Sequence, residues 1–137
     1  MVSRSSPARS GRATTGFAPR AIQTLSQEAT LAAGEIDRVA LAGQLRGLAE
    51  RLERALALEG LVTRRLVLKL RYADGERVTR SLSLDRGVAT ASELLALAQE
   101  LLARTHAGSR PVRLLGLAAT GLERPRRDER QLMLFDR

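Results

Sequence analysis

Hydrophobic residues recur with a helical period in the first half of the chain. Five leucines at spacings of three and four form one apolar stripe and predict a helix from Arg38 to Glu59. Asp37 stands at the N-cap position, and Gly60 follows as a stop signal. The stripe consists of Leu41, Leu45, Leu48, Leu52 and Leu56.

A second stripe of this kind predicts a helix over residues 91–105. Thr90 and Glu93 have the spacing of a capping box, and Gly108 is the expected end. Its apolar face would comprise Leu94, Leu97, Ala98, Leu101 and Leu102.

Between these helices the hydrophobic period falls to two, which predicts a β-hairpin. Residues 64–72 and 77–84 alternate apolar and polar side chains, and Asp74-Gly75 is a strong tight-turn signal. Arg80 shares the phase of the apolar set, so either a bulge redirects it or the apolar face is incomplete there. The polar face would carry Arg65, Lys69, Arg71, Arg77, Thr79 and Ser81.

Two further strands are predicted, at 24–31 and 111–119. The phase of the last one stays open, because Val112 alternates with Arg113 whereas Leu115 and Leu117 share the parity of Arg113. The order is then β-α-β-β-α-β. This order predicts an α+β fold, with a four-stranded, mostly antiparallel sheet and two helices packed on one face.

Composition points to an anionic partner. The net charge is +8, and Lys69 is the only lysine among 23 basic residues. Nucleic acid is the first candidate and an anionic membrane surface the second. A GC-rich coding sequence could explain the preference for arginine, but not why the predicted hairpin is basic. Because Phe17, Tyr72 and Phe135 are the only aromatic residues, base stacking is not the expected mode of binding.

Several kinds of chemistry are disfavoured. The chain has no cysteine and a single histidine, His106, and it lacks a phosphate-binding glycine loop and an aspartate cluster. We therefore expect no catalysis by this chain alone, no metal and no cofactor. The absence of cysteine and of a long apolar run favours a cytoplasmic protein without a membrane partner.

The basic polar face has two interpretations. Arginines, short hydroxyls and strand amides suit contacts with DNA phosphates, but an ordinary solvated antiparallel face has the same composition. At this point the residues add a resemblance. Four stretches are similar to strands of the little finger domain of Y-family translesion DNA polymerases, the DNA polymerase IV branch in particular: TLSQEATL at 24–31, LVTRRLVLKLRY at 61–72, VTRSLSL at 78–84 and PVRLLG at 111–116.

The resemblance implies a sheet laid against the backbone of primer-template DNA, in a module concerned with damaged DNA and its repair. The family often has arginine where Gln27 stands, so one phosphate contact would be lost, and an aromatic residue where Gly75 stands. With Lys69 and Arg71 of the polar face, the implied DNA-contacting residues are Ser26, Thr79, Arg80, Ser81 and Arg113.

The last seven residues, QLMLFDR, form a separate motif after a polar segment. Gln131, Leu132, Leu134 and Phe135 are similar to the bacterial sliding-clamp-binding pentapeptide. A chance apolar tail or a final strand is the alternative, although exposed apolar segments usually have a partner. The expected organisation is a basic disordered linker at 1–22, a DNA-binding domain at 23–122 and a flexible clamp-binding tail at 123–137.

The palm, fingers and thumb of the family have no counterpart in this sequence. The chain could be a fragment, the product of a split gene with separate catalytic domains as a partner, or a free-standing regulator that competes for clamp or template. A ferredoxin-like metabolite-binding domain is a further alternative, which the basic face and the tail motif disfavour.

Overall fold

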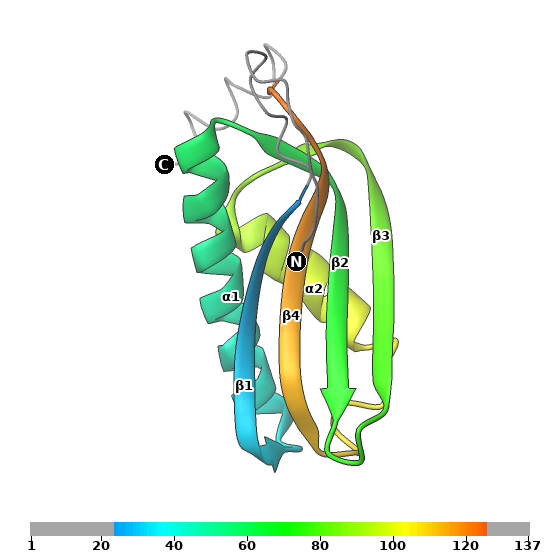
Figure 1. Cartoon of the computed structure of the whole chain (residues 1–137). Helices are drawn as coiled ribbons and strands as arrows, with labels where there is room; N and C mark the ends of the chain where they lie inside the picture. Colours follow the sequence, from blue (N-terminus) through cyan, green and yellow to red (C-terminus); the bar gives the residue numbers. More distant parts are fainter. Residues whose placement is uncertain (1–23, 126–137) are drawn as a thin grey trace, which may run out of the picture.

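The computed structural model describes residues 24–125, which form one antiparallel sheet with two helices behind it (Figure 1). The strands lie in the order β1-β4-β2-β3, so the last strand occupies a central position. The predicted order of elements and the fold class are confirmed. The elements are β1 (Leu25–Glu35), α1 (Arg38–Glu59), β2 (Val62–Tyr72), β3 (Arg77–Val88), α2 (Ala91–Leu102) and β4 (Val112–Glu123).

Both helices begin where the sequence predicts. The Asp37 side chain accepts from the Val39 N–H, and the Thr90 hydroxyl accepts from the Glu93 N–H. Helix α1 ends at Gly60, whose φ of 67° is the left-handed conformation common after a helix.

The predicted end of α2 is wrong. The helix stops at Leu102, and Gly108 lies in the loop that follows. Arg104 and Thr105 donate backbone N–H bonds to residues three positions earlier, and the Thr105 hydroxyl donates to the Leu102 carbonyl at 2.7 Å. This side-chain bond takes an acceptor that another helical turn would use, as threonine hydroxyls do near helix ends.

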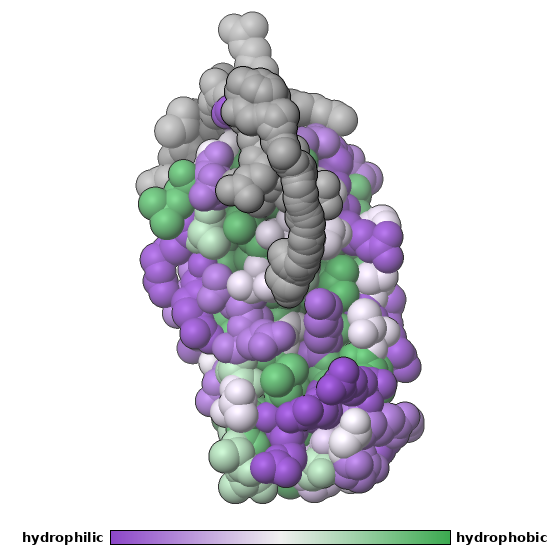
Figure 2. Space-filling model, in the orientation of Figure 1, coloured by the Kyte–Doolittle hydropathy of each residue, from purple (hydrophilic) through white to green (hydrophobic). Residues whose placement is uncertain are grey.

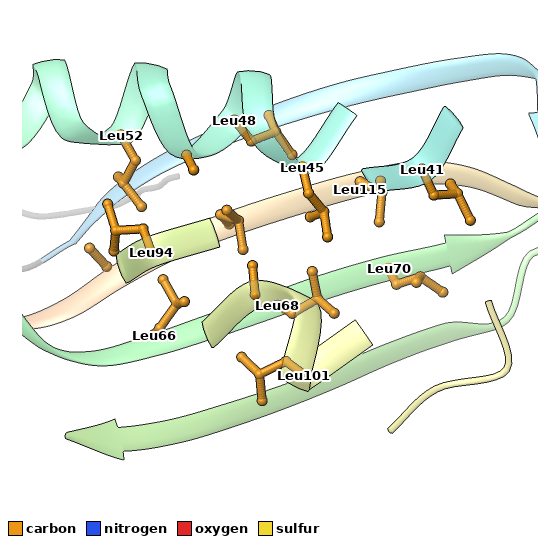
Figure 3. Close-up of a cluster of buried hydrophobic side chains, with 14 of the residues drawn as sticks. Leu41, Leu45, Leu48, Leu52, Leu66, Leu68, Leu70, Leu94, Leu101 and Leu115 are labelled. Atoms are coloured by element: carbon orange, nitrogen blue, oxygen red, sulfur yellow. The ribbon is translucent and has the colours of Figure 1, made fainter. Parts of the chain in front are cut away.

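The core between helices and sheet is aliphatic, apart from Tyr72. The leucine stripe of α1 is completely buried, and it packs with leucines of β2, β4 and α2 (Figure 3). Full burial of a leucine stabilises a fold by about 1.5–3 kcal/mol before entropy is counted. Within the described part of the chain, no helix is long and apolar enough to cross a membrane.

A bulge at Arg113 settles the phase of β4. Tyr72 pairs with Val112 and Arg71 pairs with Leu114, so Arg113 is an extra residue between them. The bulge turns both Val112 and Leu115 towards the helices, and both are fully buried.

Of the two predictions for Arg80, the incomplete apolar face is confirmed and the bulge is wrong. Arg80 pairs directly with Leu68 and no bulge interrupts the register there, so it lies on the helix side of β3. It stays exposed because β3 is an edge strand, and its guanidinium donates to the Thr79 carbonyl at 3.0 Å.

Candidate nucleic-acid interface

The sheet has one face without helices, which we call the open face (Figure 1). Residues directly opposite each other on neighbouring strands point to the same side, so the strand register shows which residues belong to the open face. Figure 2 shows this side of the molecule, where hydrophilic side chains make up much of the surface. Its residues are Ser26, Glu28 and Thr30 of β1; Leu114, Gly116, Ala118 and Thr120 of β4; Arg65, Val67, Lys69 and Arg71 of β2; and Arg77, Thr79, Ser81 and Ser83 of β3.

The cations of the open face lack carboxylate partners among the described residues. Arg71 and Arg77 stand directly opposite each other on β2 and β3. Like charges in this position destabilise a sheet. Arg65 donates to the Ser81 hydroxyl at 3.1 Å, and neither Lys69 nor the Arg71–Arg77 pair contacts an acidic group in residues 24–125.

Several arginines elsewhere in the domain are neutralised. Arg64 meets Glu123 at 2.6 Å, and Arg104 meets Glu100 at 3.1 Å. Further ion pairs join Arg86 to Glu93 and Arg110 to both Asp74 and Glu76. Positive charge is left available on the open face, and also on α1, where no ion pair within residues 24–125 includes Arg46 or Arg54.

The centre of the open face carries small side chains. Gly116 of β4 lies between Glu28 of β1 and Lys69 of β2, and Ala118 lies between Ser26 and Val67. A side chain at Gly116 would meet the Glu28 Cγ at 3.3 Å. The central strand therefore adds little height to this part of the sheet.

The structure brings together five of the seven predicted DNA-contacting residues. Ser26, Lys69, Arg71, Thr79 and Ser81 all belong to the open face. Arg80 lies on the other side of the sheet, and Arg113 sits in the β4 bulge, where its guanidinium donates to the Ala32 carbonyl at 3.0 Å.

Gln27 pairs with Leu117 and faces the helices, so its departure from the family pattern does not alter the open face. The predicted clamp-binding residues Gln131, Leu132, Leu134 and Phe135 lie outside the described residues.

Two charged residues were missed by sequence reasoning. Glu28 belongs to the open face, and its alternation with Ser26 and Thr30 was the available signal. Arg110 braces the β2–β3 turn, and its guanidinium lies 3.9 Å from the centre of the Tyr72 ring and 2.5 Å from Asp74. Nothing local in the sequence indicates this contact, because the partners are separated by more than 30 positions.

The turn has one perturbed carboxyl group. The Glu76 N–H, which donates to Asp74 at 3.0 Å, and the Arg110 guanidinium hold the pKa of Asp74 below its usual value. Asp74 is exposed at the end of the hairpin, so this effect concerns the turn rather than reaction chemistry. Within residues 24–125, no three acidic, histidine or cysteine side chains are grouped so that they could hold a metal ion.

Fold and face together define the class: an α+β module with one basic, helix-free sheet face. The chain belongs to the impB/mucB/samB family C-terminal domain, whose profile matches residues 22–134. The resemblance to the little finger domain of DNA polymerase IV is thereby confirmed.

Curated relatives agree with this assignment. The chain is 52% identical over 69 residues to DNA polymerase IV of Halorhodospira halophila, covering 50% of this chain and 19% of that protein. It is 45% identical over 89 residues to DNA polymerase IV of Alkalilimnicola ehrlichii, covering 64% and 25%. It is 30% identical over 113 residues to DNA polymerase IV 1 of Bacillus subtilis, covering 82% and 27%. The chain thus spans about a fifth to a quarter of the length of these relatives.

Two solved structures share the fold. One is a little finger domain of PolIV in complex with the beta-clamp processivity factor, with a TM-score of 0.61 and 26% identity over 75% of this chain and 92% of that one. The other is Dbh DNA polymerase in a post-insertion binary complex, with a TM-score of 0.61 and 15% identity over 74% of this chain and 29% of that one. The second likeness concerns the fold alone.

Proposed function

We propose that this chain is a DNA-binding module of a Y-family translesion polymerase, and that the open face grips the backbone of primer-template DNA. The observation that carries the proposal is the set of cations without carboxylate partners, Lys69, Arg71 and Arg77, on a face lined by hydroxyls and small residues. Phosphate contacts of this kind hold a duplex without reading its sequence. Family membership supports the same function.

Neutralising the Arg71–Arg77 pair tests this proposal. Arg71→Gln/Arg77→Gln should weaken binding to primer-template duplexes of any sequence, measured by fluorescence anisotropy over a range of salt concentrations. Each lost phosphate contact should reduce the slope of log K against log salt by about 0.9. Wild-type dissociation constants of about 10⁻⁴–10⁻⁶ M at physiological salt are expected for non-specific binding.

The matched control is Arg46→Gln/Arg54→Gln. These two arginines are exposed on α1, so the net charge changes equally while the open face stays intact. The control should keep the salt slope of the wild type. An equal loss in both double variants would show that overall charge, and not the open face, attracts DNA.

Arg80 and Arg113 form a second, outer group in this proposal. Arg80 lies on the helix side of the edge strand β3, so it contributes only where the DNA backbone passes around that edge. Arg113→Ala should flatten the salt slope by about one phosphate contact. It should also remove the side-chain bond to the Ala32 carbonyl, and faster exchange of the backbone amide hydrogens at the end of β1 would show that this end has loosened.

We further infer that the tail binds a bacterial sliding clamp. The supporting observations are the sequence QLMLF at 131–135 and the fold shared with a little finger domain that was solved with a clamp. Leu134 and Phe135 would be the anchors, because a few buried apolar side chains usually dominate an interface. Gln131 and Leu132 would set the register of the peptide.

Deleting residues 131–137 should abolish clamp pull-down and leave DNA affinity and the melting temperature unchanged. Leu134→Ala/Phe135→Ala should have the same effect, whereas Met133→Ala, at the variable position of the motif, serves as the control. If the truncated protein unfolds, these residues belong to the core and the clamp proposal is wrong.

A further inference from the structure

We propose that Glu28 competes with DNA phosphates for Lys69 and thereby limits how tightly the open face holds DNA. The inference rests on the proposed function of this face. In this inference, the negative charge of Glu28 lowers the affinity of the open face for DNA. The other open-face side chains of β1 are the hydroxyls of Ser26 and Thr30.

The register places Glu28 and Lys69 in one row across the sheet. Glu28 pairs with Gly116 on β4, and Gly116 pairs on its other side with Lys69 on β2. The three residues therefore share the open face, on adjacent strands that run side by side in Figure 1. Two inter-strand steps separate the Cα atoms of Glu28 and Lys69 by about 10 Å.

Gly116 leaves the space between the two charges free of a side chain. A Cβ built on it would lie 3.3 Å from the Glu28 Cγ and 3.7 Å from the Lys69 Cβ. The Glu28 stem thus bends over the glycine towards β2, and the stem of Lys69 begins on the opposite border of the same gap. Both side chains are exposed and long enough for the carboxylate and the ammonium group to approach each other above Gly116.

No described cation holds the Glu28 carboxylate for a structural purpose. Arg51 reaches this residue from α1, but its guanidinium donates to the Glu28 backbone carbonyl at 3.4 Å, on the peptide rather than on the acid group. The other charged residues of the open face are Arg65, Lys69, Arg71 and Arg77, all of them positive. A carboxylate among them repels a phosphate, and by swinging onto Lys69, the nearest cation, it would take the partner that the phosphate would use.

The experiment compares Glu28→Gln with Glu50→Gln by fluorescence anisotropy, using one primer-template duplex at several salt concentrations. Glu50 is exposed on α1, so both variants gain the same charge, and only one gains it on the open face. Glu28→Gln should bind about two- to fivefold tighter, the range of a single exposed charge pair. Its salt slope should steepen by up to about 0.9, the value for one additional phosphate contact. Glu50→Gln should keep the wild-type slope.

Repeating the comparison in a Lys69→Met background tests whether Glu28 lowers DNA affinity through Lys69. Without the ammonium group there is nothing for the carboxylate to occupy, so Glu28→Gln should change affinity much less than it does in the wild type. Circular dichroism and thermal melting of each variant check that the fold is kept.

Three results would overturn the inference: Glu28→Gln binding like Glu50→Gln, Glu28→Gln binding more weakly than the wild type, or an undiminished gain in the Lys69→Met background. Failure of the proposed function gives a different result. In that case the wild type shows no salt-dependent binding, and Arg71→Gln/Arg77→Gln behaves like its α1 control.

Discussion

At the scale of single residues, Tyr72 shows how one side chain can organise a region. It is the one tyrosine of the chain and is 1% exposed, at the end of β2 where the hairpin turn begins. Its hydroxyl accepts from the His106 N–H at 2.8 Å, and Arg110 stacks on its ring. The turn, the loop after α2 and the start of β4 are thereby fixed to one another.

Removing the Tyr72 hydroxyl should therefore destabilise the domain without affecting DNA binding. Tyr72→Phe leaves the His106 N–H without its acceptor, and a partly buried donor in this state costs about 1–2 kcal/mol. Urea denaturation measures the change. Ser83→Ala, a hydroxyl removed from the open face, should alter the free energy of unfolding by less than about 0.5 kcal/mol.

Asp74 makes the stability of the domain depend slightly on pH in the acid range. Its pKa is lowered in the folded state, so the stability that it contributes is present above its unfolded pKa, about 3.9, and is lost as the pH falls through the lower folded value. Asp74→Asn should melt below the wild type at pH 6, and the two melting curves should converge as the pH falls well below 4. A constant difference across this range would show that charge at Asp74 has no part in stability.

At the scale of elements, local patterns predict the helices well and the strand register less well. The leucine stripe and the two N-caps need only neighbouring residues, and they were predicted correctly. The bulge at Arg113 and the position of Arg80 depend on which strand lies alongside, and alternation within one strand does not contain this information. The opposition of Arg71 to Arg77 was not predicted either, because a two-residue turn at Asp74-Gly75 would pair position 71 with position 78, whereas the structure pairs Arg71 with Arg77.

Helix α1 contains two glycines that its packing does not require. A Cβ at Gly43 or at Gly47 would have no atom within 4 Å outside its own helix and chain neighbours. Glycine in a helix interior is less stable than alanine by about 0.5–1 kcal/mol, so Gly43→Ala and Gly47→Ala should each raise the free energy of unfolding by that amount.

The hairpin turn provides the opposite case, because Gly75 has a φ of 96°. Gly75→Ala has equally free space around it but should destabilise the domain by about 1–2 kcal/mol. Chemical denaturation of the three variants side by side separates the two effects. A destabilised Gly43→Ala or Gly47→Ala would mean that the helix needs its glycines.

At the scale of the whole molecule, the sheet order is the feature that sequence patterns could not supply. Four antiparallel strands can be arranged in several ways, and the central place of β4 depends on pairings between residues such as Ser26 and Ala118, more than 90 positions apart. Alternation along the chain predicted the open face only over the β2–β3 hairpin. The contribution of Glu28 on β1 became visible once β4 was seen to join β1 to that hairpin.

We expect no nucleotide transfer from this chain alone. The pure protein should fail to extend a primer with magnesium or manganese, because two-metal chemistry needs grouped carboxylates and residues 24–125 contain no such group. Separately produced palm, fingers and thumb domains of a DNA polymerase IV, tested with and without the chain, provide the positive control. Template-dependent extension by the chain in isolation would contradict its assignment as an accessory module.

The strand order also has a mechanical consequence. Leu25, at the start of β1, pairs with Ala119, near the end of β4, so the described chain enters and leaves at one pole of the sheet. Tension between these two points pulls along the inter-strand hydrogen bonds, which run perpendicular to the strands. The bonds between β1 and β4 would therefore break one after another, beginning at this pole. Under load β1 would peel away first, and the leucine core between β2 and the helices would yield last.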